Sequence, residues 1–318
     1  MDQPAPTAGA WPFSAELMLR CKSLAPIRSA IAHPCDPVAI EAVVEAAELG
    51  LIDPILVGPE DKIQAAADAA GVDIRRFRRE PTPHSHAAAA RAVALVRCGE
   101  AGLLMKGSLH TDELMHEVLA RDTGLRTDRR LSHVYLIEVD SYPRPLLITD
   151  GAINIAPDLD AKRDIVQNAI DLALVLGFRE PKVAILSAIE TVNARLPSTV
   201  EAAALCKMAD RGQITGGLLD GPLAMDNAIS LEAAREKGIV SRVAGLADIL
   251  VAPDLMAGNI LAKQLTFMVG GHAAGVVVGA RAPIVLTSRA DSQQARVTSC
   301  AMAVLSAHSL GLAPTARR

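Results

Sequence analysis

The segment LTSRADS, residues 286–292, places three chemically active side chains at the end of an aliphatic run. Ser288 can donate a hydrogen bond, Arg289 is a permanent cation, and Asp291 can accept a proton. A guanidinium binds phosphate oxygens, while a hydroxyl and a carboxylate can serve as oxyanion donor and base, so the group suits acyl or phosphoryl chemistry. A structural reading also fits, in which Asp291 or Ser292 caps the following helix and Arg289 pairs with a surface acid.

A second candidate is LMKGSLHTDEL, residues 104–114, where a strand leads into a helix. Lys106, Gly107, Ser108 and Thr111 supply a cation, backbone N–H groups and hydroxyls at a helix start, which is a common phosphate site. The two acidic residues after Thr111 also suit the helix dipole and would repel a close anion. A plain strand-to-helix turn therefore remains an equal alternative.

Three further strand ends, ITDGAIN, LLDGPLAMD and VAPDLMAGN, contribute weaker candidates. The first two contain Asp-Gly, which is commonly only a turn. In the third, an asparagine can cap the following helix instead of binding a ligand. The candidate residues are Asp150, Asp220, Asp254, Asn259 and Lys263.

The elements that position these residues alternate between short aliphatic runs and helical segments, which predicts an α/β fold with parallel strands. A first series has strands near 26–33, 54–58 and 102–107, with helices near 37–50, 87–96 and 111–121. A second series has strands near 131–139, 145–151, 181–187, 214–221, 248–254, 273–280 and 283–288, with helices near 158–177, 198 onward, 257–270 and 292–310. Ser198 and Glu201 have the spacing of a capping box. The polar segment 122–133 marks a domain change near 124–132.

Composition excludes several classes of function. The net charge is −4 and the chain has one Trp, two Tyr and four Phe, so a basic surface with stacking aromatics for nucleic acid is not expected. We expect no membrane span and no export signal. The five cysteines have no CxxC spacing and the eight histidines no HExxH motif, which indicates reduced cytoplasmic thiols and no metal site. GxGxxG and GxxxxGK[ST] nucleotide motifs are absent from the expected places.

The chain resembles the phosphate acetyl/butyryltransferase family, and its butyryltransferase-like branch most, in seven segments that occur in the same order: LMKGSLHT, RLSHV, LLITDGAIN, PKVAILSAIETVN, DGPLAMDNAIS, ADILVAPDLMAGNILAKQL and PIVLTSRADS. This resemblance implies exchange of a short acyl group between coenzyme A and inorganic phosphate, with coenzyme A as substrate and no tightly bound cofactor. It implies two α/β/α domains of the isocitrate and isopropylmalate dehydrogenase type, a substrate cleft between them, and a homodimer. The chain's end is expected to return to the first domain, which gives domains of 1–128 plus 281–318 and 129–280.

The resemblance also implies roles for individual residues. Ser288 and Arg289 match the Ser-Arg pair of acetate-type relatives, whose catalytic aspartate follows seven residues after the serine; here that position is Ala295. We therefore assign to Asp291 the role of the base that accepts the thiol proton of coenzyme A. Those relatives carry an arginine five residues beyond the threonine matching Thr111, where this chain has His116.

The other site residues are expected to bind substrate in the same cleft. Gly107, Ser108 and Thr111 would hold phosphate from the facing domain, and Asn259 and Lys263 would line the cleft. Two alternatives stay open: a metal-dependent NAD(P) dehydrogenase on the same fold, and a non-catalytic protein that binds coenzyme A or acyl phosphate. The second alternative is favoured by Ala295 and His116, which stand where acetate-type relatives carry the catalytic aspartate and the arginine.

Overall fold

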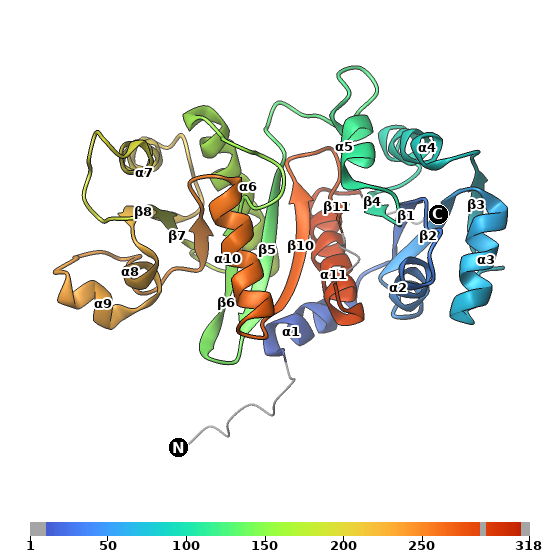
Figure 1. Cartoon of the computed structure of the whole chain (residues 1–318), viewed down its shortest axis with the longest axis horizontal. Coiled ribbons are helices and arrows are strands. Elements are labelled where there is room, and N and C mark those ends of the chain that lie inside the picture. Colours follow the sequence, from blue (N-terminus) through green and yellow to red (C-terminus); the bar gives the residue numbers. More distant parts are fainter. Residues whose placement is uncertain (1–10, 287–290, 313–318) are drawn as a thin grey trace.

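The computed structural model describes residues 11–286 and 291–312. One mixed sheet of eleven strands runs through this part of the chain in the order β3-β2-β1-β4-β11-β10-β5-β6-β9-β7-β8. The molecule is elongated along this sheet, with the early strands at one end and β7 and β8 at the other (Figure 1). The α/β class predicted from the alternation of elements is confirmed.

The N-terminal section follows the predicted alternation closely and adds three elements that the pattern did not reveal: α1, α3 and β3. Strands β1, β2, β3 and β4 are parallel to one another where they pair. The elements are α1 (Pro12–Cys21), β1 (Ile27–Ala32), α2 (Pro37–Glu48), β2 (Ile52–Gly58), α3 (Glu60–Ala70), β3 (Arg78–Pro81), α4 (Ser85–Arg97), β4 (Leu103–Lys106) and α5 (Thr111–Leu119).

The second section begins with an antiparallel pair, β5 and β6, and then returns to parallel pairing through β9, β7 and β8. Helices α8 and α9 were not expected. The elements are β5 (Ser132–Val139), β6 (Tyr142–Thr149), α6 (Leu159–Leu176), β7 (Lys182–Leu186), α7 (Pro197–Asp210), β8 (Leu218–Leu223), α8 (Met225–Ile229), α9 (Leu231–Glu236), β9 (Ile249–Val251), α10 (Leu255–Phe267), β10 (His272–Val278), β11 (Ile284–Val285) and α11 (Gln293–Ser309).

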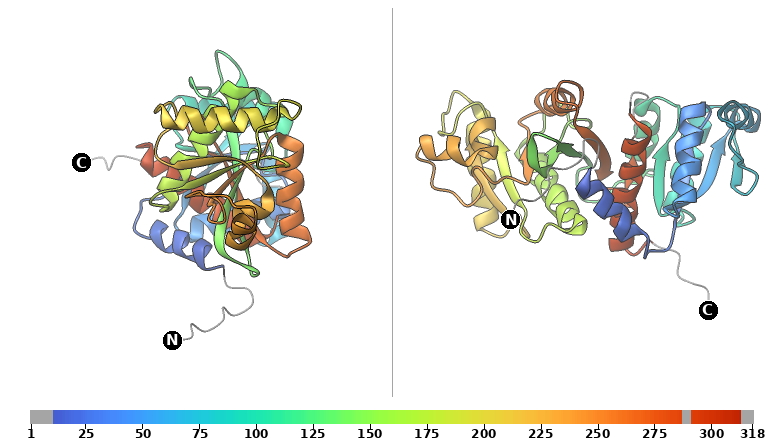
Figure 2. Two further views of the ribbon diagram at one scale, coloured as in Figure 1. Left: turned by 90° about the vertical axis from the view of Figure 1, so that its left-hand side faces the viewer. Right: turned by 90° about the horizontal axis from the view of Figure 1, so that it is seen from below.

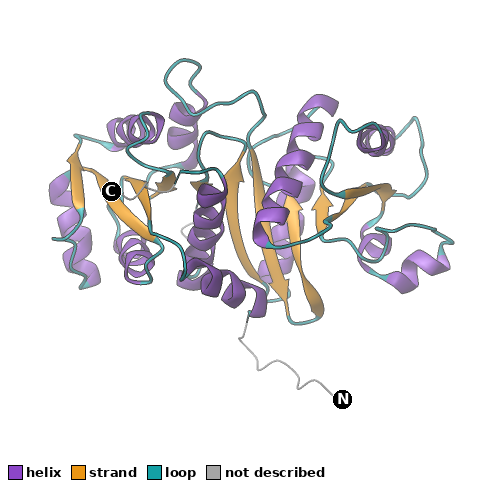
Figure 3. Cartoon of the chain, turned by 180° about the vertical axis from the view of Figure 1, so that it is seen from behind, coloured by secondary structure: helices purple, strands orange, loops and turns teal. Residues whose placement is uncertain are grey.

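Helices cover both faces of the sheet (Figures 2 and 3). One continuous apolar core joins one face to α1, α2, α3, α6, α7 and α11. The other face has two cores, one beneath α4 and α5 and one beneath α8, α9 and α10. The largest fully buried side chains are all leucine or isoleucine, as expected for a chain so poor in aromatic residues.

Within the sheet the two sections meet at β10 and β11, and the strand pairing there is short. β10 pairs antiparallel with β5 along its whole length, but with β11 only at Val277 and Ile284. Beyond that pair, α11 lies where a neighbouring strand would otherwise pair with β10. The Gly275 N–H there donates to Ser299 Oγ at 2.9 Å. β11 continues into the N-terminal section by pairing with β4.

The capping box predicted at Ser198 is wrong. The N-cap of α7 is Leu196, two residues before Ser198, and Pro197 lies in the first turn. Because proline suits the first helical position, Ser198 is drawn inside the helix, where its hydroxyl bonds Ser187 Oγ at 2.9 Å. Glu201 instead forms an ion pair with the buried Lys162.

Candidate active site

A cavity of about 400 Å³ lies beside the segment LTSRADS. Residues 287–290 lie outside the described residues, and so therefore do Ser288 and Arg289. Their flanking neighbours Leu286 and Asp291 both line this cavity. The segment with the predicted Ser-Arg pair thus begins and ends on the wall of one hollow.

The remaining walls come from several parts of the fold, including β10 and Trp11. Helix α10 contributes Lys263 and Phe267, β5 contributes His133 and Tyr135, and the start of α11 contributes Ala295. The cavity exists here because β10 and β11 separate after a single pair and α11 enters beside β10. Of the predicted residues, Asp291 and Lys263 are brought together in this way.

The start of α10 is fixed against the loop after β6. Asp254 is the N-cap of α10 and accepts a hydrogen bond from the Ala257 N–H at 2.9 Å, so Asn259 is not the cap. Asn259 instead donates from Nδ2 to the Gly151 carbonyl at 2.9 Å. A Cβ at Gly258 would lie 2.4 Å from the Asp150 carbonyl oxygen, so only glycine allows this close approach. Both Asp254 and Asn259 therefore position α10.

Asp150 is buried and its carboxylate is saturated with hydrogen bonds. Oδ1 accepts from the backbone N–H groups of Ala152 (2.9 Å), Ile153 (3.1 Å) and His133 (3.3 Å). Oδ2 accepts from the backbone N–H of Asn154 at 3.0 Å and from its side-chain Nδ2 at 2.6 Å. Asp150 thus organises the loop 150–154, and a substrate would have to displace one of these donors to reach it.

The predicted phosphate segment after β4 is packed against the end of β1. A Cβ at Gly107 would meet the His33 carbonyl oxygen at 2.5 Å. The Ser108 hydroxyl donates to the same carbonyl at 2.8 Å and accepts from the Cys35 N–H at 3.2 Å. The buried Lys106 Nζ donates to the carbonyls of Gly107 and Leu109, both at 3.3 Å. This turn therefore has a clear structural role. It follows β4, which is the direct neighbour of β11 in the sheet.

Two of the remaining predicted residues lie on α5 and one on β8. Thr111 is the first residue of α5 and is exposed, and His116 is exposed in its last turn. Asp220 accepts from the Gly221 N–H at 2.9 Å on β8, which five strands separate from β11. At about 4.8 Å per strand, roughly 29 Å separates these two strands. The structure does not bring Asp220 to the cavity.

Sequence reasoning missed three residues around this cavity. His133 is buried, and burial lowers its pKa to about 4 although the Asp150 charge opposes the shift. Burial also raises the pKa of Tyr135 to about 12, with added contributions from the charges of Asp291 and Asp150. Arg296 is buried and donates from Nε to the Asp291 carbonyl at 3.3 Å. The one sequence signal for His133 was a histidine within a predicted, mainly apolar strand.

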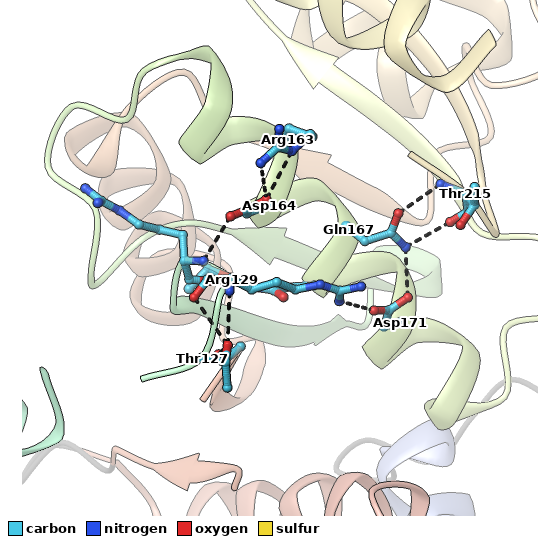
Figure 4. Close-up of polar contacts among 11 residues, drawn as sticks. Thr127, Arg129, Arg163, Asp164, Gln167, Asp171 and Thr215 are labelled. Atoms are coloured by element: carbon cyan, nitrogen blue, oxygen red, sulfur yellow. Dashed lines mark hydrogen bonds and ion pairs between the residues drawn. The ribbon is translucent and has the colours of Figure 1, made fainter. Parts of the chain in front are cut away.

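A second, polar hollow of about 540 Å³ lies between α6 and the residues preceding β5. Two of its arginines pair with aspartates: Arg129 with Asp171, and Arg163 with Asp164 at 2.9 Å (Figure 4). Thr127 Oγ1 accepts from the Arg129 N–H at 3.1 Å in the same network. These contacts hold the segment that precedes β5 against α6.

Among the described residues, no cluster of three or more His, Cys, Asp or Glu side chains could hold a metal ion. All five cysteines are free thiols. Within the described ranges, the helices are too short or too polar to cross a membrane.

A sequence profile described as "Phosphate acetyl/butaryl transferase" matches residues 82–304. The chain is 63% identical over 289 residues to a phosphate acetyltransferase of Rhizobium meliloti, an alignment covering 91% of this chain and 92% of that protein. The chain belongs to the phosphate acetyl/butyryltransferase family. It is also 42% identical to a phosphate butyryltransferase of Clostridium acetobutylicum, over 91% of this chain and 96% of the relative.

A solved structure of a branched-chain phosphotransacylase from Enterococcus faecalis supports the same family fold. It superimposes with a TM-score of 0.77 at 33% identity and covers 89% of this chain and 99% of that one. The recognition of the family from seven collinear segments is confirmed. The family relatives differ in the acyl group that their names give, so acyl preference stays open.

Proposed function

We propose that this protein is a phosphate acyltransferase that exchanges a short acyl group between coenzyme A and inorganic phosphate. Family membership over most of the chain supports this activity. The observation that supports a site near Ser288 and Arg289 is the cavity lined by Leu286 and Asp291, which flank residues 287–290. Coenzyme A is a substrate here, and the chemistry calls for no bound cofactor.

In the direction of acyl-CoA synthesis, the thiol sulfur attacks the carbonyl carbon of an acyl phosphate. The thiol loses its proton, a tetrahedral oxyanion forms, and the bond from the carbonyl carbon to the phosphate oxygen then breaks. Arg289 binds the phosphate and balances its charge, and Ser288 donates to the oxyanion. A free thiol has a pKa of about 8.5, so a base is needed near neutral pH. Asp291 or another group on the cavity wall serves as this base.

The other predicted residues form the surroundings of this site in our proposal. Lys263 supports binding of the anionic substrate from α10, where it lines the cavity. Gly107, Ser108 and Thr111 would approach phosphate from the N-terminal section. The domain division at 1–128 plus 281–318 and 129–280 belongs to the same proposal.

We further propose a cytoplasmic homodimer. Helix α10 carries exposed apolar side chains on one face, with Met256 at 68%, Ile260 at 64% and Phe267 at 69% exposure. These positions lie three to four residues apart or at multiples of that spacing, so they form a single stripe. Such a stripe is typical of a protein–protein interface. Five free thiols suit a reducing compartment.

The experiment that tests the proposed function is phosphate-dependent release of free CoA thiol from acetyl-, propionyl-, butyryl- and longer acyl-CoAs. We expect turnover with at least one short acyl chain and none without phosphate. Binding of acyl-CoA without any release would instead favour the non-catalytic alternative, which Ala295 and His116 keep open.

A further inference from the structure

The cavity beside LTSRADS is lined by a buried imidazole whose Nδ1 has no hydrogen-bond partner among the described residues. His133 lines the cavity with only 2% of the residue exposed. Its Nδ1 is enclosed and makes no hydrogen bond within the described residues. The ring contacts Tyr135 edge-on, with 4.2 Å between ring centroids. Buried polar side-chain atoms are normally paired, so an unpaired one beside a cavity calls for an explanation.

A second histidine of the same cavity shows what a structural role looks like. His272 is also buried and also lines this cavity. Its Nε2 is within 3.2 Å of Thr298 Oγ1, and its ring stacks on Trp11 with centroids 5.3 Å apart. His272 is therefore held by its neighbours. His133 has its backbone fixed by Asp150 and Thr149, while among the described residues its ring packs against Tyr135.

The backbone around His133 is shaped to admit this ring. A Cβ at Gly275 would lie 2.5 Å from His133 Cε1 and 2.7 Å from its Nε2. Glycine at 275 on β10 thus leaves room for the imidazole on the neighbouring strand β5. At this residue the other edge of β10 bonds to α11. Ala295, which lines the same cavity, has no titratable group.

We propose that His133 is the base that accepts the thiol proton of coenzyme A. This role rests on the proposed function. The thiol S–H proton passes to an imidazole nitrogen, the sulfur forms its bond to the carbonyl carbon of the acyl phosphate, and phosphate leaves with the electrons of the broken C–O bond. In the reverse direction, the imidazolium returns the proton to the departing thiolate.

The groups around His133 suit this exchange. Burial lowers the pKa of His133, which keeps the imidazole in the neutral form that can accept a proton but also makes it a weaker base. The charge of Asp150, held by backbone donors, favours the imidazolium once it forms. Tyr135, Asp291, Lys263 and His272 are the other titratable side chains among the described residues that line the cavity. Asp150 itself is not the acceptor, because its carboxylate oxygens are already occupied.

The test compares His133→Gln with His272→Gln over pH in the direction of acyl-CoA synthesis. A lost base typically lowers the rate about 10²–10⁴-fold, so we expect kcat of H133Q to fall about 100-fold at pH 7. The fraction of free thiolate rises about 30-fold between pH 7 and 9.5. The deficit of H133Q should therefore shrink to about 3-fold at pH 9.5. If kcat of H272Q falls at all, it should fall by the same factor at every pH.

A deficit of H133Q that stays constant with pH, or a deficit of H272Q that shrinks in the same way, would overturn the role of His133. Circular dichroism verifies that both variants fold. If H133Q does not fold, His133→Asn is measured in the same way, and recovery of H133A activity by added imidazole provides an independent result. Wild-type protein without phosphate-dependent turnover would reject the proposed function itself, whereas an active wild type with a pH-independent H133Q deficit would reject only the base.

Discussion

The saturated carboxylate of Asp150 gives a sharp prediction for stability. In Asp150→Asn, the amide oxygen can keep the position of Oδ1, where three backbone donors converge. The amide NH₂ then replaces Oδ2 and faces two donors of Asn154. Hydrogen bonds to a charged group contribute about 1.5–3 kcal/mol each, so loss of two should cost about 3–6 kcal/mol of unfolding free energy.

Urea unfolding followed by circular dichroism measures this cost, and Asp254→Asn is the matched control. Asp254 is an N-cap, and asparagine caps as well as aspartate, so D254N should change stability by less than about 0.5 kcal/mol. A D150N variant that loses less than about 1 kcal/mol would refute the structural interpretation. Asp150 would then return as a candidate substrate ligand.

Four further predictions follow from named contacts. Gly107→Ala should lower the thermal midpoint by the equivalent of about 1–3 kcal/mol, because the new Cβ would meet the His33 carbonyl at 2.5 Å; an unchanged midpoint would mean that the strand ends can separate. Burial of neutral His133 lowers its pKa to about 4, so the unfolded chain binds the extra proton and stability should fall as the pH drops from about 6.5 to 4; urea midpoints of H133Q that follow the wild-type acid dependence would contradict this. Arg289→Ala should abolish turnover with the fold intact, and near-normal activity would remove its role in phosphate binding. Ile260→Glu should convert a dimer to monomer in light scattering, since it places a charge in the apolar stripe of α10; an undisturbed dimer would place the interface elsewhere.

The alternation of elements could be predicted from the sequence because it depends on local patterns. Aliphatic runs such as PKVAILS and the helix between Asp158 and Gly177 keep their boundaries within a few residues. The capping box at Ser198 failed because Pro197 competes for the helix start. The sequence alone does not show which of two neighbouring residues, Pro197 or Ser198, sets the start of the helix.

The candidate site was only partly predictable, because its geometry depends on sheet order. Asp150 and Asp220 have the same Asp-Gly pattern, yet β6 and β8 lie in different parts of the sheet. Asp254 and Asn259 were both predicted to bind substrate in the cleft. In the structure, the hydrogen bonds of both side chains fix the position of α10. His133 was missed because its importance depends on Gly275, which is distant in sequence and opposite in the sheet.

The most direct test of the central claim is to identify both products of one reaction. Purified protein is mixed with acetyl-CoA or butyryl-CoA and inorganic phosphate, and ³¹P nuclear magnetic resonance is recorded while a thiol reagent counts free CoA. We predict an acyl phosphate signal that grows in step with CoA, one for one. Release of CoA without acyl phosphate would indicate plain thioester hydrolysis and contradict the proposed acyl transfer.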